Sequence, residues 1–194
     1  MKVWDIRSPI LSVNQEALYI FILIEVFSCE ERIVRKVLVF GNSASGKSTL
    51  AKRLAASQQL AHLDLDLLAW QATNPPTRVP LVESAKAIES FMQLHDNWVI
   101  EGCYSDLLKV AEHKSTEIIY MNLSVEDCII NANNRPWEPH KYASKAEQDA
   151  NLTMLIQWVS QYQHRDDNFS KAAHLAFYQN YIGAKKMLTT NSCC

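Results

Sequence analysis

A glycine-punctuated run between a strand pattern and a helix pattern constrains this chain more than any other feature. Residues 37–40 are aliphatic or aromatic, which predicts a buried strand over 36–40. Residues 48–57 carry leucines and alanines at helical spacing, which predicts a helix. The run that joins them fits the pattern G-x-x-x-x-G-K-[ST], in the strand–loop–helix context that the pattern requires. It reads Gly41-Asn42-Ser43-Ala44-Ser45-Gly46-Lys47-Ser48, and two of the four glycines of the chain occupy its fixed glycine positions.

This run predicts a site for the phosphates of a nucleoside triphosphate. Successive backbone N–H groups of such a loop, together with the start of the next helix, form a cradle for anions. Lys47 is expected to reach the β- and γ-phosphates, and the Ser48 hydroxyl is expected to ligate Mg²⁺. The alternative is an ordinary glycine turn that a serine caps. The expected nucleotide-binding residues are Gly41, Asn42, Ser43, Ala44, Ser45, Gly46, Lys47, Ser48 and Thr49.

Strand-like and helix-like segments alternate along the rest of the chain. Prolines mark loops at 75–80 and 134–142. Ser124, with Asp127 three residues later, is expected to cap the helix that follows it. The alternation predicts an α/β fold, in which helices cover both faces of a parallel sheet of about five strands. The further strands are expected at 60–65, 98–102, 117–121 and 187–190, and further helices at 81–94 and 124–133.

Composition supports one compact domain over residues 35–194. The chain has 194 residues, against roughly 150 for a typical domain, and 48% of them are apolar, enough for a sizeable core. Lysine and arginine number 19 against 21 for aspartate and glutamate, so nucleic acid is not an expected partner. The five cysteines are scattered without a C-x-x-C pair, which favours a reducing cytoplasm over a zinc or disulfide framework.

Residues 1–34 form an N-terminal extension of uncertain status. Residues 17–27 are strongly apolar, but Glu25 interrupts them, and they are fewer than the roughly 20 residues of a membrane-spanning helix. Phe27 is bulky where a processing site has small residues, so neither export nor a membrane anchor is expected. Two possibilities stay open: an element that packs on the domain, or a segment translated from an overextended start codon, with Val34 as the true initiator.

The phosphate-binding run occurs in several classes of protein, and two of them lack support here. A GTPase would carry an N-K-x-D guanine signature and a D-x-x-G switch, and the sequence contains neither. A motor or AAA-type ATPase would carry an apolar strand that ends in paired acids, whereas Asn122 and Leu123 follow the strand expected at 117–121. A small kinase remains.

Five segments, at 41–49, 62–66, 98–102, 134–141 and 165–167, follow one another along the chain. In this order they resemble the shikimate kinase and adenylate kinase group of small P-loop kinases, and most of all its shikimate kinase-like ATPase branch. The resemblance covers residues 36 to about 186. It implies a P-loop NTPase three-layer fold with a mobile lid at about 134–165. It also implies ATP and Mg²⁺ as cofactors, and a small hydroxyl- or phosphate-bearing acceptor.

Asp64 and Asp66 come at the carboxyl end of the strand expected at 60–65, the edge at which open α/β sheets place ligands. At alternate strand positions the two carboxylates point the same way. The resemblance implies that Asp64 holds a magnesium-bound water, and that Asp66 orients the acceptor hydroxyl and accepts its proton. The expected metal residues are therefore Ser48 and Asp64. The alternative is a pair of loop-edge acids or a helix cap.

Arg135 and Arg165 belong to the expected lid. Phosphoryl transfer is catalysed mostly by positioning and by cations that stabilise charge on the transferring group, and the resemblance implies that these arginines supply such cations. The alternative for each is a weak surface salt bridge. The expected catalytic residues are Lys47, Asp64, Asp66, Arg135 and Arg165. Three further residues either line the lid or are solvated: His140, Lys141 and Tyr142.

The acceptor is expected at the same edge of the sheet, beyond the third strand. Gly102 allows close approach of the backbone to an acceptor, and Arg78 is the sole arginine between Asp66 and Glu101. Aromatic residues such as Trp70 and Trp137 either stack on a base or acceptor, or pack in the protein. The expected substrate-binding residues are Asp66, Arg78, Glu101, Gly102 and Tyr104.

Two functions remain open. The first is an Mg·ATP-dependent kinase for a small acceptor, which the acid pair and the lid arginines favour. The second is an ATP-dependent regulatory switch that hydrolyses ATP slowly and signals to a protein partner. Shikimate kinases are expected to carry three consecutive glycines where this chain has Glu101-Gly102-Cys103, and this departure leaves room for the second function.

Overall fold

The structure is a computed structural model that describes residues 34–73, 75–139 and 142–191. The chain divides into a unit Met1–Ile33 and a unit Val34–Cys194, and the second is the one described below. The expectations for residues 17–27, and the residues Cys29, His140, Lys141, Cys193 and Cys194, lie outside the described residues.

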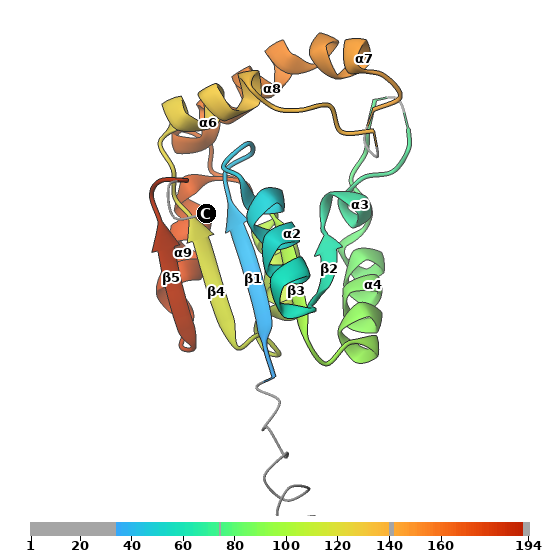
Figure 1. Ribbon diagram of the computed structural model, residues 1–194, viewed down its shortest axis with the longest axis vertical. Helices are drawn as coiled ribbons and strands as arrows, with labels where there is room; N and C mark the ends of the chain where they lie inside the picture. The colour runs from blue at the N-terminus through green and yellow to red at the C-terminus, as the bar shows by residue number, and fades with distance from the viewer. Residues whose placement is uncertain (1–33, 74, 140–141, 192–194) are drawn as a thin grey trace, which may run out of the picture. The chain divides into compact units, whose positions relative to one another are not determined.

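A parallel sheet forms the centre of the described unit (Figure 1). Its five strands lie in the order β2-β3-β1-β4-β5, and every neighbouring pair is parallel. The strands are β1 Lys36–Gly41, β2 Ala61–Asp64, β3 Trp98–Gly102, β4 Glu117–Met121 and β5 Ala184–Leu188. The predicted fold class is confirmed, and the strand that precedes the glycine run is the central one.

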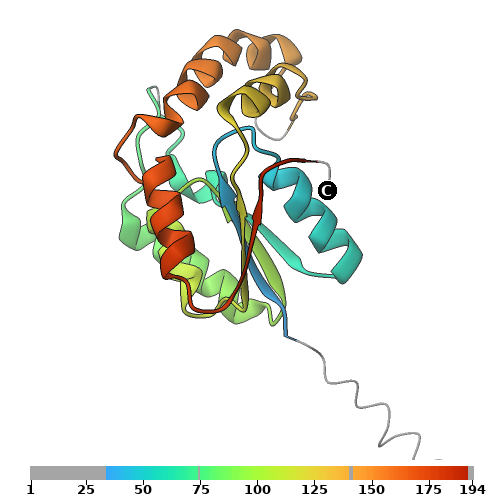
Figure 2. The same cartoon turned by 90° about the vertical axis from the view of Figure 1, so that its left-hand side faces the viewer.

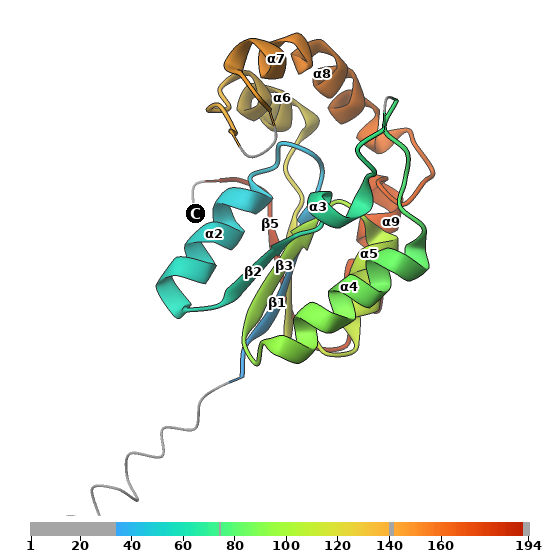
Figure 3. The same cartoon turned by 90° about the vertical axis from the view of Figure 1, so that its right-hand side faces the viewer.

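Helices cover both faces of the sheet. The helix α2 (Lys47–Gln58) lies on one face, and α4 (Leu81–Leu94), α5 (Ser105–Glu112) and α9 (Lys171–Asn180) lie on the other (Figures 2 and 3). The strand β1 packs against both layers, because Val37 and Val39 join the core under α2 while Leu38 and Phe40 join the opposite core. All four side chains are fully buried, which explains why this strand is continuously apolar.

A second group of helices lies over the carboxyl ends of the strands, at the end of the sheet where the loop after β1 emerges (Figure 1). The helix α6 (Val125–Asn133) leads into the segment expected to be the lid. That segment contains the helices α7 (Lys145–Ala150) and α8 (Leu152–Ser160), followed by the 3-10 helix η1 (Gln161–Gln163). Ser124 caps α6 as predicted, since its Oγ accepts the backbone N–H of Asp127 at 3.0 Å.

Two elements differ from the sequence prediction. The last strand was expected at 187–190, but β5 begins at Ala184 and ends at Leu188. Its first three residues are exposed and two are lysines, so pairing with the backbone of β4, rather than burial, defines where the strand begins. The short helix α3 (Asp66–Ala69) follows β2 directly and ends that strand before residue 65. In the described part of the chain, no helix is long and apolar enough to cross a bilayer.

Candidate active site

The loop between β1 and α2, residues 41–48 (the P-loop), needs glycine at both of its fixed glycine positions. Gly41 has φ 148°, and a Cβ atom there would lie 2.4 Å from the carbonyl oxygen of Met121 on the neighbouring strand. Gly46 has φ 93° and occupies the N-cap position of α2. A side chain is strained at such φ values, so the two glycines allow the chain to turn tightly from the strand into the helix.

The side chain of Lys47 is held inside the P-loop. Lys47 is buried, and its Nζ donates to the backbone oxygen of Asn42 at 2.8 Å. Ser45 is buried as well, and its Oγ has no hydrogen-bond partner among the described residues. The N-cap residue of α2, Gly46, makes no side-chain hydrogen bond to the first turn of the helix in the described structure. An ammonium group, a buried hydroxyl and the start of a twelve-residue helix therefore converge where an anion would bind.

Two acidic side chains point to the P-loop face of the sheet. In the strand register, Glu101 of β3 is aligned with Val39 of β1 and with Asp64 of β2. Aligned residues of neighbouring strands share a face, and Val39 belongs to the core under α2. Glu101 is 2% exposed, and its Oε1 lies 3.7 Å from His62 Nε2 but has no hydrogen-bond partner in the described residues. A buried carboxylate oxygen that accepts no hydrogen bond is available to a cation.

The strand β1 has two neighbours in the sheet, β3 and β4. The strand predicted at 117–121, now β4, has no acid at its carboxyl end, whereas β3 carries Glu101. The signal was present, because Glu101 ends an apolar run in the sequence, but only the strand order shows that this run adjoins β1. No group of three or more histidine, cysteine or acidic residues suited to a metal occurs in the described ranges. Magnesium needs only one or two carboxylates beside phosphate and water.

The geometric prediction for Asp66 is wrong. Asp64 and Asp66 were expected at alternate positions of one strand, but β2 ends at Asp64 and Asp66 begins α3. The chain turns here because Asp64 Oδ1 accepts the backbone N–H of Asp66 at 2.9 Å. The carboxylate of Asp66 instead accepts the hydroxyl of Tyr104, with 2.7 Å between the two oxygens.

Tyr104 and Arg78 form a cluster with Asp66, called the acceptor cluster below because the sequence predicts all three residues to bind the acceptor. The Tyr104 hydroxyl accepts the indole N–H of Trp70 at 2.7 Å, and burial raises the pKa of that hydroxyl. The Arg78 guanidinium lies 4.8 Å from the centre of the Tyr104 ring and donates to Asp106 Oδ2 at 2.9 Å. Arg78 NH1 is buried without a hydrogen-bond partner in the described residues. The structure thus brings together three predicted substrate-binding residues that are far apart in the sequence.

Gly102 is needed for packing inside the protein. A Cβ atom at this position would lie 2.9 Å from the Cβ of Leu65. The next residue, Cys103, is buried. Burial raises the pKa of Cys103 to about 12, and the nearby Lys47 charge only partly offsets this. The thiol is therefore protonated and unreactive at neutral pH.

The two lid arginines are held by residues of their own segment. Arg135 NH1 pairs with Glu138 at 3.1 Å. Arg165 pairs with Asp167 at 2.6 Å, and its guanidinium lies 3.6 Å from the centre of the Trp158 ring. The conformation described here therefore matches the alternative stated for both arginines, local salt bridges. The other tryptophan of this segment, Trp137, is half-exposed and donates to a neighbouring backbone oxygen.

A buried chain of hydrogen bonds joins β4, η1, α9 and the acceptor side. His174 Nε2 lies 3.0 Å from the backbone oxygen of Cys103, which can only accept, so Nε2 carries the proton. Nδ1 then accepts the Tyr162 hydroxyl at 2.8 Å, and the Tyr162 oxygen lies 2.9 Å from the Tyr120 hydroxyl. Burial lowers the pKa of His174 to about 4. No motif in the sequence singled out these residues.

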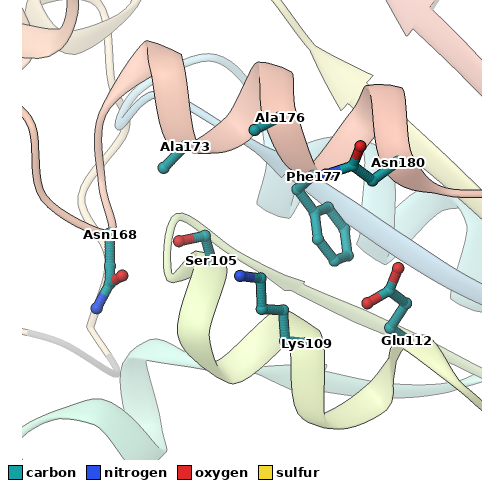
Figure 4. A pocket seen from close by; sticks show the side chains of 8 residues that line it. All are labelled: Ser105, Lys109, Glu112, Asn168, Ala173, Ala176, Phe177 and Asn180. Atoms are coloured by element: carbon teal, nitrogen blue, oxygen red, sulfur yellow. The ribbon is translucent and has the colours of Figure 1, made fainter.

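A hollow of about 240 Å³ lies between α5 and α9 (Figure 4). Phe177 and two alanines of α9 form its apolar side, and Lys109 and Glu112 of α5 face them. None of the predicted site residues lines it.

No family model matches the chain, and no curated protein matches it in sequence. Solved structures do match: a gluconokinase from Sinorhizobium meliloti 1021 shares 13% sequence identity with a TM-score of 0.50, over 83% of this chain and 85% of that one. The chain has the small P-loop kinase fold. An unliganded sugar kinase from Janibacter sp. HTCC2649 aligns at 12% identity and a TM-score of 0.46, over 80% of this chain and 85% of that one. A shikimate kinase from Bacteroides thetaiotaomicron aligns at 12% and 0.45, over 80% and 86%.

The comparison with the gluconokinase bears on the architecture and not on individual residues, because identity at this level carries only the fold. The predicted P-loop kinase fold is confirmed. The roles predicted for single residues remain predictions.

Proposed function

We propose that this protein is a kinase that transfers the γ-phosphoryl group of Mg·ATP to a small hydroxyl- or phosphate-bearing acceptor. The observation that carries the proposal is the P-loop geometry, in which two glycines with positive φ let the loop bring Lys47 and the start of α2 together. The solved structure that aligns with a TM-score of 0.50 is a gluconokinase by name, which supports a kinase for a small molecule.

The nucleotide phosphates bind to the backbone N–H groups of residues 41–48 and to the start of α2, near Thr49. Lys47 exchanges the backbone oxygen of Asn42, its present partner, for phosphate oxygens. An ammonium group that already lies in a buried loop loses little freedom in this exchange, so the loop is preorganised for phosphate.

Ser48, Asp64 and Glu101 fit magnesium. Ser48 lies in the first turn of α2, and the two carboxylates share the sheet face that α2 covers. The Oε1 atom of Glu101, which has no hydrogen-bond partner among the described residues, supports this assignment. It gives Glu101 a role at the metal in place of the acceptor contact expected from the sequence. Magnesium, when bound, neutralises charge on the β- and γ-phosphates.

The acceptor binds at the cluster of Asp66, Arg78 and Tyr104. Asp66 orients the acceptor hydroxyl and accepts its proton, and it exchanges the Tyr104 hydroxyl for that of the acceptor. Arg78 binds an anionic group of the acceptor, because its NH1 is buried with no partner in the described part of the chain.

Arg135 and Arg165 act after the lid closes. Each gives up a carboxylate, Glu138 or Asp167, to stabilise charge on the transferring group. One observation favours the second candidate, an ATP-dependent switch with slow hydrolysis: both arginines are committed to these local pairs, and a lid that stays in this state would leave the transferring group without them.

The test is ADP release from Mg·ATP, alone and with a panel of sugars, sugar acids, small alcohols, shikimate-like acids and nucleoside monophosphates. A kinase gives a large acceptor-dependent increase, whereas a switch gives slow hydrolysis that no acceptor changes. Lys47→Ala should lower turnover roughly a hundredfold or more with the fold intact. The matched control is Lys52→Ala, which removes an exposed lysine from the same helix. Full activity in a folded Lys47→Ala protein contradicts the proposed role of the P-loop.

A further inference from the structure

Two side-chain amides tie the P-loop to α8, which lies within the lid segment, and to α6, which precedes it. Asn42 Nδ2 donates to the backbone oxygen of Val159, near the end of α8, at 3.2 Å. Asn131 Nδ2, near the end of α6, donates to the backbone oxygen of Ala44 at 3.0 Å. One amide reaches from the P-loop to the lid helix, and the other reaches from the opposite helix to the P-loop.

The Asn42 side chain faces α8. Asn42 is 3% exposed, and Val159 is fully buried. The carboxamide is therefore engaged with α8, and contacts to phosphate from this residue are left to its backbone. A buried amide that lost this partner would be costly, so the contact is a strong constraint on α8.

The backbone of Asn42 is where a bound nucleotide would act. Its carbonyl oxygen accepts Lys47 Nζ at 2.8 Å and the N–H of Ser45 at 3.3 Å. Phosphates that take Lys47 away remove the charged partner of this carbonyl. Ala44, which Asn131 holds, has φ 59°, a left-handed conformation that a non-glycine residue keeps only when its surroundings enforce it. Both tethered residues therefore lie where the P-loop must respond to a ligand.

The hydrogen bond between Asn42 and Val159 also lies beside the residue that contacts Arg165 of the lid. Trp158, the preceding residue of α8, is the ring on which the Arg165 guanidinium is stacked at 3.6 Å. A displacement of the last turn of α8 therefore moves the surface that holds Arg165.

We propose that Asn42 and Asn131 are positioning residues that couple phosphate binding in the P-loop to the lid helices α8 and α6. This inference rests on the proposed function, since it needs a nucleotide in the P-loop. A nucleotide changes the partners of the Asn42 backbone, the Asn42 amide transmits the change to α8, and α8 repositions Arg165. The Asn131 amide transmits a change in the backbone of Ala44 to α6 in the same way. A pair of bonds with a purely structural role would stabilise the fold without responding to nucleotide.

The experiment is hydrogen exchange, followed by mass spectrometry, with and without Mg²⁺ and the non-hydrolysable ATP analogue AMPPNP. In the wild-type protein, AMPPNP should change the exchange rate of residues 152–160 by severalfold. In Asn42→Leu, which keeps a similar volume but has no amide, AMPPNP should still bind while the response in 152–160 is lost. Turnover of ATP should fall roughly tenfold or more, because misplaced catalytic groups lose rate steeply, and AMPPNP affinity should fall less than turnover.

Asn131→Ala and Asn133→Ala form a matched pair on α6. Asn131 bonds the P-loop, whereas Asn133 is exposed and its amide bonds only the backbone of its own helix. Asn131→Ala should abolish the AMPPNP response of residues 125–133, and Asn133→Ala should keep it. If Asn42→Leu does not fold, these two variants still test whether an amide bond to the P-loop couples AMPPNP binding to a lid helix.

Two results overturn the inference alone: AMPPNP binds to the wild-type protein without changing exchange in α8, or the variants respond as the wild type does. A wild-type protein that does not bind AMPPNP at all refutes the proposed function, and with it this inference. Calorimetry of AMPPNP binding, measured first, separates these cases.

Discussion

Lowering the pH from about 7.5 to about 5 should destabilise the protein through His174. The imidazole is fully buried and neutral, with both nitrogens engaged by Tyr162 and by the backbone of Cys103. Burial lowers the pKa of His174 from 6.5 to about 4, since the charged form would lose its hydration. Lys47 and Arg165 act in the same direction, and Asp167 opposes them.

The direction of this change in stability with pH follows from proton binding to His174 in the unfolded and folded states. Below pH 6.5 the unfolded chain takes up a proton at this histidine, whereas the folded protein does so only near pH 4. The stabilisation is therefore complete above pH 6.5 and is lost as the pH falls towards 4. Since each unit of pKa difference corresponds to about 1.4 kcal/mol, the loss between pH 7.5 and pH 5 is about 2 kcal/mol.

Urea unfolding at the two pH values measures this loss. His174→Gln removes the titration but retains an amide that can donate to the Cys103 oxygen, and His164→Gln is the control at an exposed histidine of the same region. The free energy of unfolding should fall more in the wild-type protein than in His174→Gln, by about 2 kcal/mol, and His164→Gln should behave as the wild type does. Equal pH dependence in all three proteins would refute the argument. An NMR titration of the wild-type imidazole gives the same answer if His174→Gln does not fold.

Two further predictions concern stability. Gly41→Ala places a Cβ atom against the backbone of Met121 and should lower the free energy of unfolding by about 3 kcal/mol, as urea unfolding would show; a variant as stable as the wild type contradicts the need for glycine there. The Phe169 ring lies within 5.5 Å of two arginine guanidinium groups, those of the acceptor cluster and of the lid. Phe169→Leu should therefore cost about 1–2 kcal/mol more than Phe91→Leu, whose ring packs against a histidine, and an equal cost for the two variants would show that these contacts contribute nothing.

The P-loop and the elements around it were predictable because their signals are local. The β1–loop–α2 unit spans residues 36–58, and each φ that needs glycine is set by residues a few positions away. The helix α4 was predicted at its observed bounds because its apolar residues recur at helical spacing. Ser124 was recognisable as a cap for the same reason, since its partner is only three residues distant.

The surroundings of two predicted site residues came only from the structure. No pattern in the sequence shows that β3 rather than β4 brings a carboxylate, that of Glu101, beside β1. Asp66 was expected on a strand that the turn at Asp64 ends. The roles predicted for both residues remain predictions.

The amino-acid sequence by itself therefore determined the P-loop, the alternation of strands and helices, and the class of fold. Only the tertiary structure decided which side chains meet: Glu101 with the P-loop face, Asn42 with Val159, and His174 with Tyr162 and Cys103. The physical reason is the range of the interactions. Backbone conformation responds to neighbours within a turn or two, whereas Asn42 and Val159 are 117 residues apart and meet only because the sheet brings β1 beneath the lid helices.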